Sequence, residues 1–121
     1  MTESGFRRVA LGMSDAIEGA HMGHPDFRAA GRIFATLRGD KKHGCVMLTP
    51  DQQAHFVGDY PDAFTPESGA WGRQGSTRVI LAAVDAEVLG EAVTLAWRNA
   101  HKKAVARAKK PAPRKPGAPT R

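Results

Sequence analysis

Apolar positions recur with helical spacing near both ends of the chain. Near the start, this spacing predicts a short amphipathic helix over about residues 3–12. Its apolar face is formed by Phe6, Val9, Ala10 and Met13. Near the other end, it predicts a longer helix after the capping residue Asp85, on Val88, Leu89, Ala92, Val93, Ala96 and Ala100. Between the two helices lies the part of the chain in which most β-branched and aromatic core candidates occur.

The stretch from His21 to Thr49 is predicted to form three consecutive antiparallel strands with two turns. The strands lie near residues 26–29, 32–37 and 45–48. A tight turn is expected at Ala30-Gly31, because glycine adopts the positive φ that such turns need. The polar, glycine-bounded segment 38–44 makes the other connection and is long enough to project as a wing.

A second helix has the clearest start signal in the chain. Thr49 is a good N-cap, Pro50 suits the first helical position, and Gln52 completes a capping box. The remaining predictions are a strand over 77–82, a brief extended segment at Phe64 and Thr65, and loops over 14–20 and 67–76. Together these elements predict an α+β fold, with an antiparallel sheet of about four to five strands packed against N- and C-terminal helices.

The chain length sets the domain organisation. At 121 residues there is room for one core, so we expect a single domain over residues 1–100. The basic segment that follows, residues 101–121, is rich in alanine, lysine and proline. It is predicted to continue as a helix and then to be disordered from Pro111, because its prolines accompany no large apolar residue.

Cysteine usage and the hydropathy of the N-terminus suggest where the protein works. Cys45 is the only cysteine, which excludes an intrachain disulfide and fits a reducing cytoplasm. The first residues contain no apolar stretch long enough for a signal peptide, and no segment is apolar enough to span a bilayer. We therefore expect a cytoplasmic, monomeric protein.

The net charge of +6 is unevenly distributed along the chain. Residues 1–100 hold ten basic and twelve acidic side chains, a balance of −2, whereas residues 101–121 hold eight basic and no acidic ones, a balance of +8. A basic segment of this kind is typical of an arm that binds polyanions without sequence specificity. The alternative is a solubilising terminus. The net positive charge of the chain is therefore a property of the tail and not of the domain.

Four motifs carry a resemblance to a known family. They are His-Met-Gly-His-Pro-Asp-Phe-Arg (21–28), Gly-Arg-Ile-Phe-Ala-Thr-Leu (31–37), Leu-Thr-Pro-Asp-Gln-Gln (48–53) and Gly-Ala-Trp-Gly-Arg-Gln-Gly (69–75). With these motifs in the family's order over about residues 5–100, the chain resembles the YjbR/MmcQ family of small bacterial proteins. The resemblance implies a frataxin-like α+β fold, a "double wing" shape and a DNA-binding role, and it implies no catalytic residues.

Basic side chains are the candidates for contacts with the DNA backbone. Each phosphate that a cation neutralises releases counterions, which makes the affinity depend on salt. The candidates in the domain are Arg28, Arg32, Lys41, Lys42, Arg73 and Arg78, and those in the tail are Lys102, Lys103, Arg107, Lys109 and Lys110. Because no helix clearly reads bases, we expect low sequence specificity. The alternative for the 38–44 wing is an exposed hairpin kept soluble by its charge.

Other chemistry is less well supported. A pocket near His21, His24 and Trp71 would suit a protein or small-ligand partner instead of DNA. A lone tryptophan is more often packed than exposed, so we favour a Trp71 that closes the end of the core over one that stacks on a base. Without a CxxC pair or a helical HExxH, we expect no metal site and no cofactor. No nucleophile–base pair stands out, so we expect no enzymatic activity.

Overall fold

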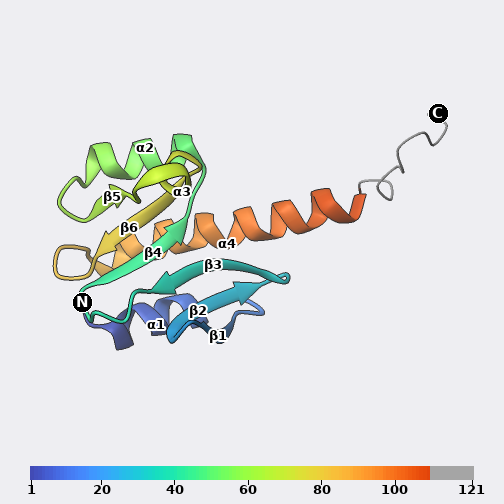
Figure 1. Ribbon diagram of the computed structural model, residues 1–121, viewed down its shortest axis with the longest axis horizontal. Coiled ribbons are helices and arrows are strands. Elements are labelled where there is room, and N and C mark those ends of the chain that lie inside the picture. Colours follow the sequence, from blue (N-terminus) through green and yellow to red (C-terminus); the bar gives the residue numbers. More distant parts are fainter. Residues whose placement is uncertain (110–121) are drawn as a thin grey trace.

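A computed structural model describes residues 1–109, in which one six-stranded antiparallel sheet packs against helices (Figure 1). The helices are α1 (Glu3–Leu11), α2 (Pro50–Asp59), α3 (Gly69–Arg73) and α4 (Ala86–Lys109). The strands are β1 (Ile17–His21), β2 (His24–Ala29), β3 (Arg32–Leu37), β4 (His43–Met47), β5 (Phe64–Pro66) and β6 (Ser76–Ile80). They lie in the order β1-β2-β3-β4-β6-β5, so the α+β class is confirmed and the sheet has one strand more than the largest number predicted.

Strand register places the core on one face of the sheet. One cross-strand row of this face runs from Phe27 through Ala35 and Val46 to Thr77, and all four side chains are buried. The helices cover this same face: α4 contacts β2, β3 and β4, and Phe6 of α1 packs against Phe27 with ring centroids 6.0 Å apart. The apolar residues that alternate along the strands and those that recur on one side of the helices therefore pack together in a single layer.

Capping residues begin the helices where the sequence predicts. The Thr49 side chain accepts from the backbone N–H of Gln52, and Gln52 in turn accepts from the N–H of Thr49, which completes the capping box of α2. At α4, Asp85 Oδ1 accepts from the backbone N–H groups of Glu87 (2.8 Å) and Val88 (3.2 Å). These bonds satisfy backbone donors that have no partner within the helix.

Two predicted loops contain regular structure. Residues 17–20 of the loop predicted over 14–20 belong to β1, which pairs with β2 along its whole length. As an edge strand, β1 buries few side chains, and Ile17 remains 63% exposed. The sequence therefore has no apolar alternation here from which a strand could be predicted. The second loop, predicted over 67–76, contains the one-and-a-half-turn helix α3.

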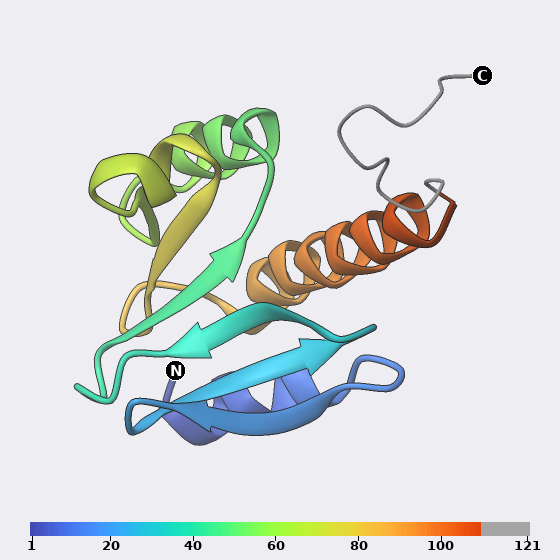
Figure 2. The ribbon, with the colours of Figure 1, turned by 45° about the vertical axis from the view of Figure 1, so that its right-hand side comes forward.

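Helix α4 extends beyond the folded body. Its core contacts end at Ala100, which is buried, yet the helix continues to Lys109. Figure 2 shows this helix between the lower strands β1–β3 and the upper strands, and then passing both. We call residues 101–109 the α4 arm. Lys110 and the disorder predicted from Pro111 lie outside the described residues. Within residues 1–109, the helices are too short or too polar to cross a membrane.

Candidate nucleic-acid interface

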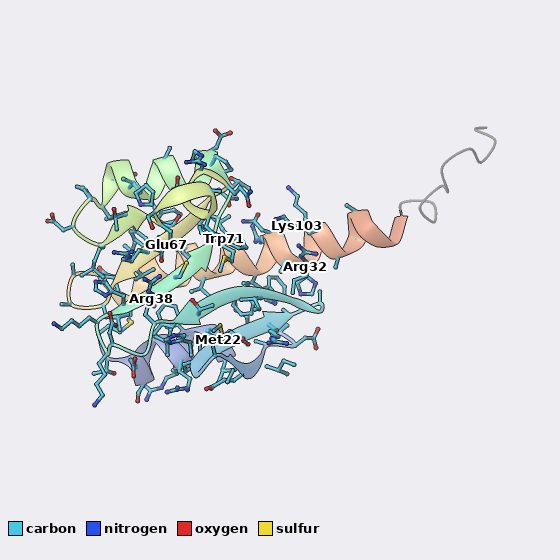
Figure 3. The ribbon with its side chains drawn as sticks, viewed as in Figure 1. Met22, Arg32, Arg38, Glu67, Trp71 and Lys103 are labelled. Carbon is cyan, nitrogen blue, oxygen red and sulfur yellow. The ribbon has the colours of Figure 1, made fainter. Side chains whose placement is uncertain are left out.

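The antiparallel strands give the sheet two ends, and the predicted site residues divide between them. β3 begins at Arg32, while the β3–β4 turn that follows it carries Lys41 and Lys42. A six-residue strand spans about 20 Å, so these residues lie at opposite ends. Figure 3 shows the same separation, with Arg32 beside Lys103 and Arg38 near the other end of β3. The domain cations therefore do not form one patch.

The end that holds Arg32 also receives the α4 arm. Asn99 donates through Nδ2 to the backbone oxygen of Met47 (3.1 Å) and to Gln52 Oε1 (2.8 Å), which fixes α4 against the end of β4. Lys103 follows Asn99 by one helical turn and therefore lies on the same side of α4. We call this end of the sheet the arm end.

Cations at the arm end are available to a ligand. Lys102, Lys103 and Arg73 are exposed, and Arg32 is half-buried. None of the ion pairs between described side chains includes any of these four. The helical backbone of the arm extends further through Arg107 and Lys109. Positive charge thus accumulates here, and no ion pair between described side chains neutralises Arg32, Arg73, Lys102 or Lys103.

The opposite end of the sheet carries a tight turn. Asp40 accepts hydrogen bonds from the backbone N–H groups of Lys42 (2.8 Å) and His43 (2.9 Å), and its carboxylate contacts His43 Nδ1 at 2.6 Å. The bond to the His43 ring, together with the Lys42 N–H, holds the pKa of Asp40 well below its usual range. Lys41 and Lys42 are exposed, but they stand beside this carboxylate.

Two of the candidate cations within the sheet, Arg28 and Arg78, are bound to carboxylates. Arg28 makes two hydrogen bonds to Asp26, from Nε to Oδ1 (2.9 Å) and from Nη2 to Oδ2 (3.1 Å), and Asp26 is only 1% exposed. The hydrogen bond to Asp26 and the charge of this carboxylate raise the pKa of Arg28. Arg78 and Arg38 share Glu67, at 2.9 Å and 3.0 Å. Asp26 lies two residues from Arg28 in the same strand, whereas Glu67 reaches Arg38 and Arg78 only through the fold, and neither carboxylate was predicted as a partner.

Cys45 lies under this shared carboxylate, on the sheet face opposite the helices. Register aligns it with Thr36 on one side and Arg78 on the other. Burial, with a smaller effect of the Glu67 carboxylate, raises the pKa of the Cys45 thiol to about 12. The thiol therefore stays protonated near neutral pH and is a poor nucleophile.

Trp71 is exposed, and the interpretation that it closes the end of the core is wrong. Its side chain is 71% accessible on α3, at the arm end of the sheet. The buried position of α3 is instead Gly72, whose backbone lies against the backbone of Glu67. Because successive helical residues turn by about 100°, Arg73 points away from Trp71 and does not support it.

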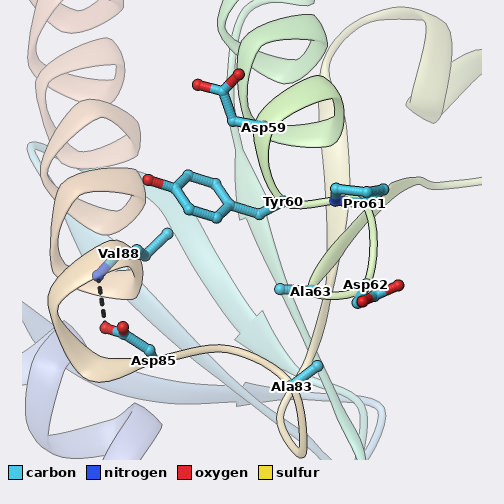
Figure 4. A pocket seen from close by; sticks show the side chains of 8 residues that line it. All are labelled: Asp59, Tyr60, Pro61, Asp62, Ala63, Ala83, Asp85 and Val88. Atoms are coloured by element: carbon cyan, nitrogen blue, oxygen red, sulfur yellow. Dashed lines mark hydrogen bonds between the residues drawn. The ribbon is translucent and has the colours of Figure 1, made fainter.

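The structure separates His24 from Trp71, and the side chain of the third candidate pocket residue, His21, is outside the described part of the structure. The His24 ring lies against Gly39 in the β3–β4 turn, at the opposite end of the sheet from Trp71. A cleft of about 270 Å³ lies elsewhere, between the end of α2 and the start of α4 (Figure 4). It is lined by Asp59, Tyr60, Pro61, Asp62, Ala63, Ala83, Asp85 and Val88. Residues 1–109 contain no group of His, Cys, Asp and Glu arranged to hold a metal ion.

Comparison with known proteins supports the fold. The model of the YjbR family matches residues 11–99. Among solved structures, the Deinococcus radiodurans protein DR2400, which carries a DUF419 domain, is similar with a TM-score of 0.62 at 20% sequence identity. The similarity covers 93% of this chain and 86% of that one. A comparison with curated proteins finds no match.

Proposed function

This chain belongs to the YjbR family, and from that premise we propose that it is a non-enzymatic DNA-binding protein of low sequence specificity. One observation carries the proposal: a basic helix projects from the folded body at the end of the sheet where other unpaired cations lie. After Glu91 the sequence contains no acidic residue, so nothing in the arm opposes its charge.

The arm suits a phosphate backbone for electrostatic reasons. A protein gains affinity for DNA with each phosphate that one of its cations neutralises, because condensed counterions are released from the DNA. A helix keeps its side chains at fixed positions along its axis, so Lys102 and Lys103 reach neighbouring phosphates without losing much backbone entropy. Arg32 and Arg73 add charge at the base of the arm.

The sheet contributes less than the sequence suggests. Arg28, Arg38 and Arg78 are each already paired with a carboxylate, so a DNA phosphate would have to displace that carboxylate to bind them. Backbone contacts carry no sequence information, so the arm alone gives low specificity. A protonated Cys45 and a Glu67 engaged by two arginines support a role without catalysis.

Charge reversal at the two ends of the sheet tests the proposal. Lys102→Glu/Lys103→Glu should weaken binding to a 20-base-pair duplex by about tenfold or more at 0.1 M salt, because two phosphate contacts are lost. Its log–log salt dependence should become shallower by about two units. The matched control is Lys41→Glu/Lys42→Glu, which makes the same charge change at the other end.

Fluorescence anisotropy against salt distinguishes the outcomes. The control should keep the affinity of the natural chain within about threefold, since only long-range attraction changes. Equal losses in the two variants would mean that net charge, and not the arm, determines binding. If a chain ending at Ala100 binds as tightly as the full chain, the arm has no role and the proposal is wrong.

A further inference from the structure

Trp71 is a large aromatic side chain that the fold leaves in solvent beside a basic arm. At 71% exposure, the indole contributes little to the core. The segment that carries it contacts the same part of the chain as α4. Gln53 donates to the backbone oxygen of Gly72 (2.9 Å), and the adjacent Gln52 accepts from Asn99 of α4 (2.8 Å). Trp71 therefore lies on the segment that leads into β6, and β6 begins at the arm end of the sheet.

The backbone under Trp71 is held in place. A Cβ on Gly72 would lie 1.6 Å from the backbone oxygen of Glu67, and one on Gly75 would lie 1.9 Å from that of Leu48. Gln53 adds further bonds to the backbone oxygen of Ser76 (3.0 Å) and to the hydroxyl of Thr77 (3.2 Å). The indole is therefore presented from a close-packed backbone, which lowers the entropy lost when a ligand stacks on it.

The charges around Trp71 favour a polyanion. Arg73, Arg32, Lys102 and Lys103 are in none of the ion pairs between described side chains. The neighbouring acid Glu67 is neutralised by Arg38 and Arg78. Asp51, in the first turn of α2, is exposed and opposes part of the positive charge. An aromatic face next to a row of cations is the arrangement by which proteins bind single strands.

We propose that Trp71 stacks on an unpaired base of a DNA strand whose phosphates lie along the α4 arm. This inference rests on the proposed function and names its ligand class: single-stranded or locally unpaired DNA. In an intact duplex each base is already stacked on its neighbours, so the indole gains a partner only where a base is unpaired. Stacking does not depend on base identity, which agrees with low specificity.

The test compares a 20-nucleotide oligothymidine with a 20-base-pair duplex on the full chain. Trp71→Ala should weaken binding to the single strand by about five-fold to a hundred-fold, the range expected for loss of one stacked base. Binding to the duplex should change by less than about twofold. Trp71→Phe should retain most of the affinity, because a smaller aromatic ring still stacks.

Met22→Ala is the matched control, since Met22 is an exposed apolar side chain (85%) in the β1–β2 turn at the other end of the sheet. It should leave both affinities unchanged. A second readout is tryptophan fluorescence. The single strand should quench it in the natural chain and not in Trp71→Ala, whose remaining tryptophan, Trp97, packs on His101 with ring centroids 4.4 Å apart.

The outcomes separate this inference from the proposed function. If Trp71→Ala binds the single strand as tightly as the natural chain while Lys102→Glu/Lys103→Glu binds neither DNA, the arm binds DNA and the stacking role is overturned. The indole would then be a contact for a protein partner. If the natural chain binds neither the single strand nor the duplex, both proposals are wrong.

Discussion

Two polar segments of this protein, residues 38–44 and 67–76, look alike in sequence and differ in structure. Both contain glycines and charged residues and connect strands. Segment 38–44 is a hydrogen-bonded turn folded around the Asp40 side chain. Segment 67–76 contains the helix α3, in which the backbone of Gly72 packs against Glu67 and Trp71 remains in solvent. After the helix, the backbone of Gly75 packs against Leu48.

The difference shows that glycine has two uses here. In segment 38–44, Gly39 supplies a positive φ of 82° for a turn. In segment 67–76, Gly72 is helical and supplies the absence of a side chain where two backbones touch. Composition alone cannot distinguish the two, because the second use depends on how closely the folded backbone of the segment approaches itself.

The largest effect should come from filling the backbone contact of α3. Gly72→Ala places a methyl group 1.6 Å from the Glu67 oxygen, so α3 must move and stability should fall by about 2–4 kcal/mol. Urea unfolding measures this change. Gly58→Ala is the control: it lies in α2 with no atom within 4 Å of the added Cβ, and it should be neutral or stabilising. Equal stability of the two variants would make segment 67–76 the flexible loop that its composition predicts.

An intermediate effect should come from the carboxylate that joins the two segments. Glu67 binds Arg38 at the start of segment 38–44 and Arg78 in β6, and its side chain is 9% exposed. Glu67→Gln should lower stability by about 1–2 kcal/mol, since both arginines are partly solvated. The exposed pair of Glu18 and Arg7 gives the control: Glu18→Gln should cost less than about 0.5 kcal/mol.

Loss of Glu67 should also change Cys45. The carboxylate helps to raise the pKa of the buried thiol, so Glu67→Gln should lower that pKa and speed the reaction of Cys45 with a disulfide reagent at pH 9. If neither stability nor thiol reactivity changes, the two segments are independent of one another.

The smallest effect should come from Asp40. Its folded pKa lies below the unfolded value of about 4, so its stabilisation is present above that pH and is lost as the pH falls through the folded pKa. Asp40→Asn should therefore have a lower Tm than the natural chain at pH 7, and the gap should narrow below about pH 4. Asp62→Asn is the exposed control. A gap that is constant from pH 7 to pH 2 would contradict this origin.

Much of the fold follows from local pattern. The strand predicted over 32–37 is β3 to the residue, and Thr49 and Asp85 cap helices as expected. Alternation and capping depend on a few adjacent residues, so they are visible in the sequence. β1 and α3 were missed because neither buries an apolar face: one pairs at the sheet edge and the other packs through glycine.

The sequence by itself also determined where net charge lies, because the arm contains no acidic residue that could neutralise it. Only the tertiary structure decided which cations are available. Arg38 and Arg78 meet Glu67, which is distant from both in sequence, whereas Lys103 is in none of the ion pairs between described side chains. The tertiary structure likewise placed Trp71 in solvent. The physical reason is that ion pairing and exposure depend on residues brought together from separate parts of the chain.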